Sequence, residues 1–397
     1  MTLCVIPFMN LTSNSRGDIK MCCNATSSTP CEFPKKEDGT RFNLAEDNIA
    51  EVWNTKEFRT IRKDMLEGKR NPTCERCYQE EDAGIESHRI KFNKRFEKSD
   101  ITFEEKLDFN PLFIDFRLST LCNLKCRMCT PFYSSQWVDE WNEVSKLVDD
   151  PVHRQLKPEE MLQLKKSTWS DKDKVYENLD LLSETITEIN LQGGEPTLIK
   201  QNIDLLEMVI NKGRAKDVVL KYISNITNIS ERQYELWKEF KHLIYHCSID
   251  AHGPLVRYIR HPADWDTIEE NFIRLHKLEN AEVFIDCTIT AYSILRLPKM
   301  IEWAKNYPNA TLFLNVLDWP NFINIRMLPP ELKQQAEEQL QPYMYHDRVP
   351  GIIKYMYSKD WYPRLFGQFT RYTNYLDNSR NEKLIDYLPE FKEYGFD

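Results

Sequence analysis

The stretch Leu121-Cys-Asn-Leu-Lys-Cys-Arg-Met-Cys-Thr130 places three cysteines, Cys122, Cys126 and Cys129, close together in the chain. It follows an apolar run, Leu112-Phe-Ile-Asp-Phe-Arg-Leu118, that is typical of a strand. A CxxxCxxC loop leaving a strand can ligate three corners of a cubane iron–sulfur cluster. One iron then stays open for another ligand, which favours chemistry at the cluster over simple electron transfer.

The alternative for this triplet is a zinc site, because cysteine clusters in reducing compartments commonly hold zinc. Structural zinc needs a fourth ligand near the triplet. The next histidine in the chain is His153, and no further cysteine precedes it. The spacing therefore favours an iron–sulfur cluster over zinc.

A second motif, Leu191-Gln-Gly-Gly-Glu-Pro196, lies downstream. Taken together, the two motifs resemble those of the radical S-adenosylmethionine (radical SAM) superfamily. In that family the open iron chelates the amine and carboxylate of S-adenosylmethionine, and a GGE-type segment holds the amine. The resemblance implies that Gly193, Gly194 and Glu195 contact the cofactor. Without the triplet, the same motif would indicate only an ordinary strand-to-helix turn.

The resemblance also implies cofactor contacts at the ends of later strands. The implied contacts to the ribose hydroxyls and the methionine carboxylate are Ser224, Asn225, Ser248 and Asp250, with Arg260 as the residue that pairs with the carboxylate. Main-chain groups near Thr290 would bind adenine. The alternative for each position is an ordinary turn or capping residue.

Another group of cysteines precedes the triplet. Cys4 is followed by a strand-like segment at residues 17–23, the helix-like motif Ile49-Ala-Glu-Val-Trp53 and the pair Cys74-Glu-Arg-Cys77. This order resembles the auxiliary-cluster module called SPASM or Twitch, although that module normally follows the barrel rather than preceding it. The resemblance implies a single [4Fe–4S] cluster, and its expected ligands are Cys4, Cys22, Cys74 and Cys77. Cys23 is the alternative to Cys22, Cys31 is a spare, and a zinc knuckle with the same ligands is the alternative to the cluster.

Beyond residue 110, runs rich in β-branched and aromatic residues alternate with amphipathic stretches. The expected strands lie at about 112–118, 187–192, 217–223, 243–249, 282–289 and 311–316. This alternation predicts an α/β fold with a parallel sheet covered by helices. The resemblance extends the prediction to a partial (β/α)6 barrel with the cofactor at the C-terminal mouth of its strands. The expected division is a cluster module at 1–95, a linker at 96–110, the barrel at 111–320 and a helical C-terminal extension at 321–397.

Composition narrows the class of protein. The chain has 397 residues, 41% of them hydrophobic, and a net charge of −9, which argues against a nucleic-acid or membrane-surface role. It contains no apolar run long enough to span a bilayer, and its first residues lack the pattern of a signal peptide. We expect a cytoplasmic protein whose clustered cysteines bind metal, and whose Cys247 and Cys287 are buried apolar residues within strands.

The resemblance implies an enzyme that reductively cleaves S-adenosylmethionine to a 5′-deoxyadenosyl radical, which then abstracts hydrogen from a substrate. The first hypothesis is a peptide or protein substrate, because the auxiliary module is common among peptide-maturing relatives. The second is a small molecule such as a sugar, nucleotide or amino acid, and the third is a non-enzymatic iron–sulfur or zinc scaffold. A flavodoxin or ferredoxin is the expected electron donor. No catalytic side chain stands out from the sequence.

Overall fold

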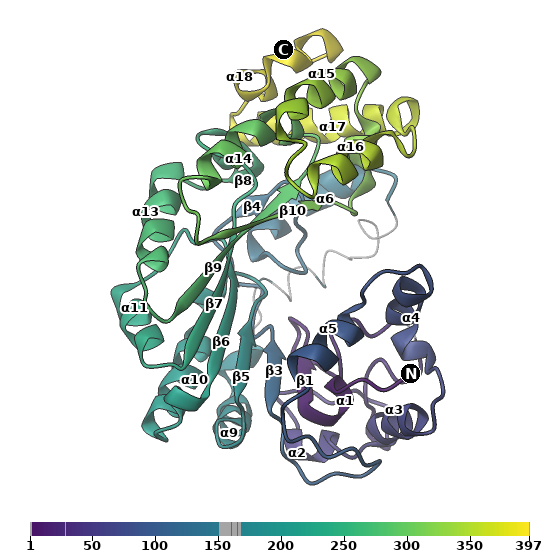
Figure 1. Ribbon diagram of the computed structural model, residues 1–397, viewed down its shortest axis with the longest axis vertical. Coiled ribbons are helices and arrows are strands. Elements are labelled where there is room, and N and C mark those ends of the chain that lie inside the picture. The colour runs from purple at the N-terminus through teal and green to yellow at the C-terminus, as the bar shows by residue number, and fades with distance from the viewer. Residues whose placement is uncertain (1, 28, 151–159, 161–164, 166–167, 397) are drawn as a thin grey trace. The chain divides into compact units, whose positions relative to one another are not determined.

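The computed structural model describes the whole chain except residues 1, 28, 151–159, 161–164, 166–167 and 397 (Figure 1). It consists of two compact units, each formed from separate stretches of the chain. The first unit contains Met1–Thr120, Ser167–Tyr222 and Ser230–Leu243. The second unit contains Leu121–Lys166, Ile223–Ile229 and Ile244–Asp397.

An eight-stranded, mostly parallel sheet forms the centre of the fold, with strand order β10-β9-β7-β6-β5-β3-β1-β2. The strands are β1 Asn10–Ser13, β2 Ile19–Lys20, β3 Phe113–Phe116, β5 Glu188–Leu191, β6 Val219–Ser224, β7 His242–Ser248, β9 Ala281–Ile289 and β10 Thr311–Val316. The last six overlap the six predicted strands, which confirms the α/β fold. Within the described residues, the sheet stays open and does not close into a barrel.

The strands form because their sequences suit a sheet covered by helices on one face. In β6, β7 and β9, every second residue is buried and the residues between are half-buried or exposed. Cys247 and Cys287 occupy two of the buried positions, and both are fully buried. The prediction that these two cysteines are apolar core residues is therefore confirmed.

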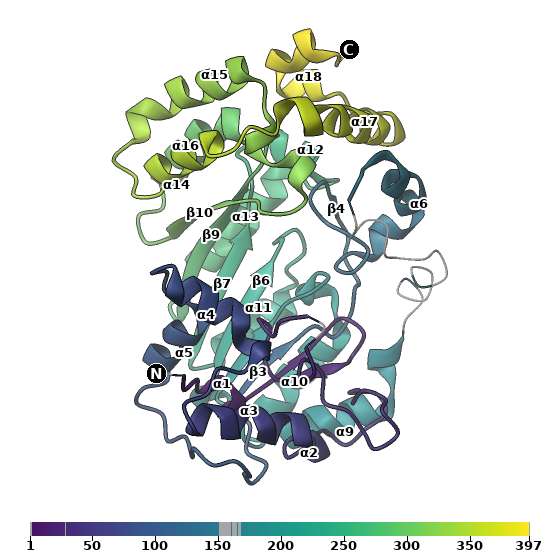
Figure 2. The same cartoon turned by 90° about the vertical axis from the view of Figure 1, so that its right-hand side faces the viewer.

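Helices of the first unit come from both of its parts. They are α1 Ile6–Met9, α2 Ile49–Val52, α3 Lys56–Leu66, α4 Glu75–Asp82, α5 His88–Arg95, α9 Asp173–Leu182, α10 Lys200–Asn211 and α11 Glu231–Lys238. Helices α9 and α10 pack on each other beside the sheet (Figure 2). Their buried residues, such as Leu179, Leu182, Leu205 and Val209, recur at helical spacing and form the apolar face that the sheet needs.

Helices of the second unit include a long C-terminal group. They are α6 Val138–Leu147, α12 Leu255–Ile259, α13 Trp265–His276, α14 Leu297–Ala304, α15 Pro330–Leu340, α16 Val349–Tyr357, α17 Tyr362–Arg380 and α18 Leu384–Tyr387. Residues 349–380 form two separate helices, α16 and α17. The second starts afresh at Tyr362, where Pro363 suits a first turn that needs no N–H donor.

The N-terminal segment joins the sheet in a way that the sequence does not reveal. Strand β1 pairs in parallel with β3, with Asn10 opposite Phe113 and Thr12 opposite Asp115. All four residues of β1 are buried, although three of them are polar. The strand does not show the apolar alternation by which strands are usually predicted, so the local sequence pattern does not reveal it.

A buried amide on α9 ties the N-terminal segment to the rest of the first unit. Asn178 accepts a hydrogen bond from Ile49 N at 3.0 Å and donates to the carbonyl oxygens of Leu44 and Asp47, each at 2.9 Å. One side chain thus satisfies three main-chain groups around the start of α2. Leaving buried main-chain groups without partners is costly.

We expect Asn178→Ala to lower the free energy of unfolding by about 2–4 kcal/mol, because it leaves these main-chain groups unpaired in a buried place. Asn211→Ala, at an exposed position on α10, is the matched control and should change stability little. Denaturant unfolding of the two variants measures the difference. Equal midpoints for both would show that Asn178 does not anchor the segment.

Candidate functional site

The three cysteines of the CxxxCxxC motif lie on a loop of the second unit that is held by a short two-stranded ladder. Strand β4, Lys125–Cys126, pairs antiparallel with β8, Arg260–His261. Burial raises the pKa of Cys126 and Cys129, and the neighbouring Cys126 and Cys122 raise that of Cys129 further. One buried and two half-buried cysteines gathered on one loop suit a metal cluster that binds them as thiolates.

Hydrogen-bond donors point at these sulfur atoms. Asn225 Nδ2 lies 3.9 Å from Cys122 Sγ, and an Arg260 guanidinium nitrogen lies 3.9 Å from Cys126 Sγ. The main-chain N–H of Leu124 donates to Cys122 Sγ at 3.5 Å. Donors of this kind stabilise negative charge on cluster sulfur ligands.

Asp250 and Arg260, both predicted to contact the cofactor, are paired with each other. Arg260 Nε lies 2.7 Å from Asp250 Oδ2, and Asp250 Oδ1 accepts a hydrogen bond from Thr288 N at 2.8 Å. Burial would lower the pKa of Arg260, but Asp250 and Cys126 raise it overall, so the guanidinium stays charged. The structure thus places Arg260 beside Cys126, with Asp250 as the group that orients it.

The remaining predicted residues of the second unit make turn contacts as well. Ser224 Oγ accepts a hydrogen bond from Ile226 N, and Thr290 Oγ1 accepts one from Tyr292 N. Asn225 differs, because it also donates to Asn123 Oδ1 on the cysteine loop at 3.1 Å. Ser248 ends β7 and is half-buried. Contact of these residues with the cofactor stays a prediction.

The GGE segment belongs to the first unit, where it forms a tight turn after β5. Gly193 and Gly194 have φ angles of 83° and 58°, which residues with a Cβ atom rarely adopt. A Cβ atom at Gly193 would lie only 2.7 Å from Arg117 Cγ. Glu195 is buried, and its carboxylate accepts hydrogen bonds from the main-chain N–H and the hydroxyl of Thr197. Its role as a cofactor ligand stays a prediction.

The predicted auxiliary ligands come together in the first unit. Cys4, Cys22, Cys74 and Cys77 line one small cavity, although they come from distant parts of the segment. Burial raises the pKa of Cys74 to about 12. Burial also raises the pKa of Cys4, and the neighbouring Cys74 and Cys77 raise it further. Four thiols around one cavity match the four corners of a fully ligated cubane.

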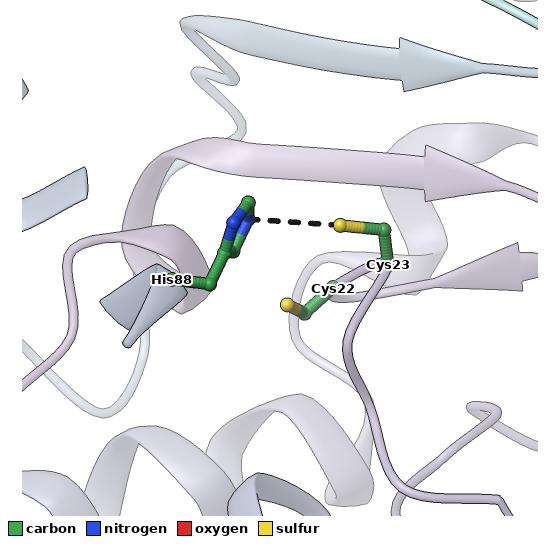
Figure 3. A group of neighbouring side chains, drawn as sticks. All are labelled: Cys22, Cys23 and His88. Carbon is green, nitrogen blue, oxygen red and sulfur yellow. Dashed lines mark hydrogen bonds between the residues drawn. The ribbon is translucent and has the colours of Figure 1, made fainter. Parts of the chain in front are cut away.

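Cys23 does not line this cavity. Its Sγ points to His88 and lies 3.6 Å from the imidazole Nε2 (Figure 3). Cys22, Cys23 and His88 also place ligand atoms within 4.8 Å of one another, so Cys22 belongs to both groups. The four-thiol cavity favours Cys22 over Cys23 as the cluster ligand, because only Cys22 faces the other three cysteines.

One polar group of the first unit was missed by the sequence analysis. Asp115 on β3 is only 2% exposed and accepts hydrogen bonds from Asn190 Nδ2, at 3.0 Å, and Gln192 Nε2. Burial raises the pKa of Asp115 to about 6, with Cys23 adding to the rise and Arg117 opposing it. An aspartate inside the apolar run 112–118 was the signal that could have revealed it.

Family models match the two regions that carry these cysteines. The model described as the radical SAM superfamily matches residues 116–294, and the SPASM model, described as an iron–sulfur cluster-binding domain, matches residues 4–78. The chain therefore contains a radical SAM domain and a SPASM domain. Its SPASM domain precedes the radical SAM domain, as predicted, and the expectation of an enzyme is confirmed at the level of the superfamily.

The radical SAM and SPASM domains also specify the cofactors. A radical SAM domain binds a [4Fe–4S] cluster and S-adenosylmethionine, and a SPASM domain binds auxiliary iron–sulfur clusters. Iron–sulfur chemistry is therefore confirmed over zinc for the N-terminal module. Every helix in the described residues is too short or too polar to cross a membrane.

Solved structures resemble this chain over part of its length. "Native anSMEcpe with bound AdoMet" is 20% identical with a TM-score of 0.39, and the match covers 61% of this chain and 62% of that one. Streptococcus suis SuiB bound to S-adenosylmethionine is 12% identical with a TM-score of 0.34, covering 76% and 52%. The chain thus spans less than two thirds of either structure. No curated protein matches it.

We expect Cys22→Ala to abolish the auxiliary cluster and Cys23→Ala to retain it, because only Cys22 lines the four-thiol cavity. After anaerobic reconstitution, iron should fall by about four atoms per chain in the first variant alone. The neighbouring cysteine serves as the matched control. Loss of iron in the Cys23 variant with full iron in the Cys22 variant would reverse the assignment.

The raised pKa of Asp115 predicts that the difference in stability between Asp115→Asn and the parent protein depends on pH. Its folded pKa of about 6 lies above the ordinary value of 3.8, so ionisation opposes folding and stability falls as pH rises between these values. The full effect at neutral pH is about 3 kcal/mol. Asp115→Asn should therefore gain thermal stability relative to the parent between pH 4 and pH 7, whereas exposed Asp217→Asn should not. A difference independent of pH would contradict the raised pKa.

Proposed function

We propose that the protein uses the cluster held by Cys122, Cys126 and Cys129 to cleave S-adenosylmethionine reductively and to modify a peptide or protein. The observation that carries this proposal is the three-cysteine loop, in which Asn225 and Arg260 donate hydrogen bonds to the sulfur atoms of Cys122 and Cys126. Three protein ligands leave one corner of a cubane open. Bound there, S-adenosylmethionine would supply a 5′-deoxyadenosyl radical that abstracts a hydrogen atom from the substrate.

The protein's own part is to hold the loop and its charges in place. Asp250 orients Arg260, and the guanidinium brings a buried positive charge to Cys126. Asn225 links the end of β6 to the loop through Asn123 and Cys122. We propose that Ser224, Ser248, Thr290 and the GGE turn complete the cofactor site, and that the catalytic domain spans 111–320.

The SPASM domain supports a peptide or protein as the substrate, because this module is common among radical SAM enzymes that mature peptides. We propose that the auxiliary cluster on Cys4, Cys22, Cys74 and Cys77 accepts an electron from the substrate radical or holds a substrate group. A flavodoxin or ferredoxin would supply electrons to the first cluster. Because this chain has a net charge of −9, an acidic electron donor would have to bind to it at a locally basic surface.

The first test is formation of 5′-deoxyadenosine by anaerobically reconstituted protein given S-adenosylmethionine and dithionite. We expect product with about eight irons per chain, as two cubanes require. Cys126→Ala should abolish the product, because it removes one of three ligands. Cys31→Ala is the matched control and should keep full iron, since Cys31 does not line the auxiliary cavity.

Other outcomes separate the competing hypotheses. Stoichiometric zinc with little iron would favour a scaffold protein. Full turnover by the Cys126 variant would contradict radical SAM chemistry at this loop. Once cleavage is established, hydrogen transfer from deuterated candidate peptides to 5′-deoxyadenosine would identify a peptide substrate, and transfer from a small molecule alone would contradict it.

A further inference from the structure

The C-terminal helix α17 holds the main chain of the cysteine loop. Arg380, at the end of α17, donates a hydrogen bond to Lys125 O at 2.9 Å. Tyr372, two turns earlier, donates its hydroxyl to Arg127 O at 2.6 Å. The two carbonyl groups flank Cys126 on either side. A helix some 250 residues away in sequence therefore fixes the middle ligand of the motif.

Arg127 of the loop is inserted into the same C-terminal segment. Its side chain is fully buried and donates to Asp377 Oδ1 on α17 at 2.6 Å. It also donates to Tyr258 O at 2.8 Å, and its guanidinium lies 3.6 Å from the centre of the Tyr258 ring. The loop and the helix thus interlock through buried polar contacts in both directions.

Arg380 also reaches the loop through its side-chain neighbours. Its guanidinium lies over the Trp137 ring at 4.9 Å, and Trp137 Nε1 donates to Cys126 O at 3.0 Å. Its second nitrogen donates to Glu140 Oε2 at 2.8 Å, and Glu140 also binds Lys125. Trp137 and Glu140 lie at and near the start of α6, on which α17 packs (Figure 2).

Arg380 and Glu140 are opposite charges beside one cluster ligand. Both side chains are largely shielded from water, with exposed fractions of 0% and 11%. Burial would raise the pKa of Glu140, but its hydrogen bonds to Arg380 and Lys125 lower it, so it is ionised at neutral pH. Charges in such surroundings act strongly on their neighbours, because little water screens them.

We propose that α17 is part of the SAM-cluster site: Arg380 positions the cysteine loop, and Arg380 and Glu140 together set the reduction potential of its cluster. Reduction of [4Fe–4S]2+ to [4Fe–4S]1+ adds one electron. A nearby positive charge stabilises that electron and a nearby negative charge opposes it. This inference rests on the proposed function only in requiring a cluster on Cys122, Cys126 and Cys129.

The test compares charge-removing variants of the reconstituted full-length protein. Arg380→Gln keeps an amide donor but loses the positive charge, and Glu140→Gln loses the negative charge. We expect the midpoint potential to become more negative in the first variant and more positive in the second. Dithionite titration followed by electron paramagnetic resonance measures it, using the signal that Cys126→Ala protein lacks.

Three control variants distinguish an electrostatic effect on the midpoint potential from a loss of structure around the cluster. Arg380→Lys keeps the positive charge and should have the same midpoint potential as the parent protein. Tyr372→Phe removes a loop hydrogen bond without changing charge and should leave the potential unshifted. Arg296→Gln breaks an ion pair with Glu390 elsewhere in the C-terminal region and should also leave it unshifted.

Opposite shifts of the midpoint potential in the two charge variants support the proposal. A structural defect would not change the direction of the shift according to the sign of the charge that was removed. Shifts in the same direction, or no shift in either, overturn the proposal. If Arg380→Gln fails to hold iron, Arg380→Lys and Glu140→Gln still decide the question. The readout needs a bound cluster but no cleavage of S-adenosylmethionine, so the proposed function can fail while this inference stands.

Discussion

The second unit depends on keeping three thiols ready to act as thiolates inside the protein. Burial alone raises the pKa of Cys126 and Cys129, so the loop needs nearby donors and positive charges. Asn225 and Arg260 supply them directly at the sulfur atoms. A cluster bound there replaces the thiol protons with iron, which removes the cost that burial imposes on free thiolates.

The two cysteine groups are brought together in different ways. The proposed SAM-cluster ligands come from one short loop, so their order in sequence already brings them together. The proposed auxiliary ligands come from the N-terminus, the turn after β2 and the start of α4, and only the fold brings Cys4 to Cys74 and Cys77. Sequence spacing was therefore strong evidence for the first group and weaker evidence for the second.

The sequence predicted whatever depends on local pattern. The six predicted strands show apolar residues at strand spacing, and the CxxxCxxC and GGE motifs are contiguous. These strands are β3, β5, β6, β7, β9 and β10. It did not predict β1, whose polar residues are buried by pairing with β3. It also missed Arg380 and Asp115, because their partners lie far away in sequence and no local pattern marks a contact of that kind.

The unusual order of the two domains has a structural explanation within the first unit. The SPASM segment precedes the radical SAM domain, yet β1 pairs in parallel with β3, the strand whose chain continues into the cysteine loop. Asn178 of α9 then satisfies the main chain around α2. Sheet pairing attaches the module to β3, and one buried amide attaches it to α9. A domain that adds its strand beside β3 gains the same attachment whether its chain comes before or after, because strand pairing requires proximity in space and not a particular order along the sequence.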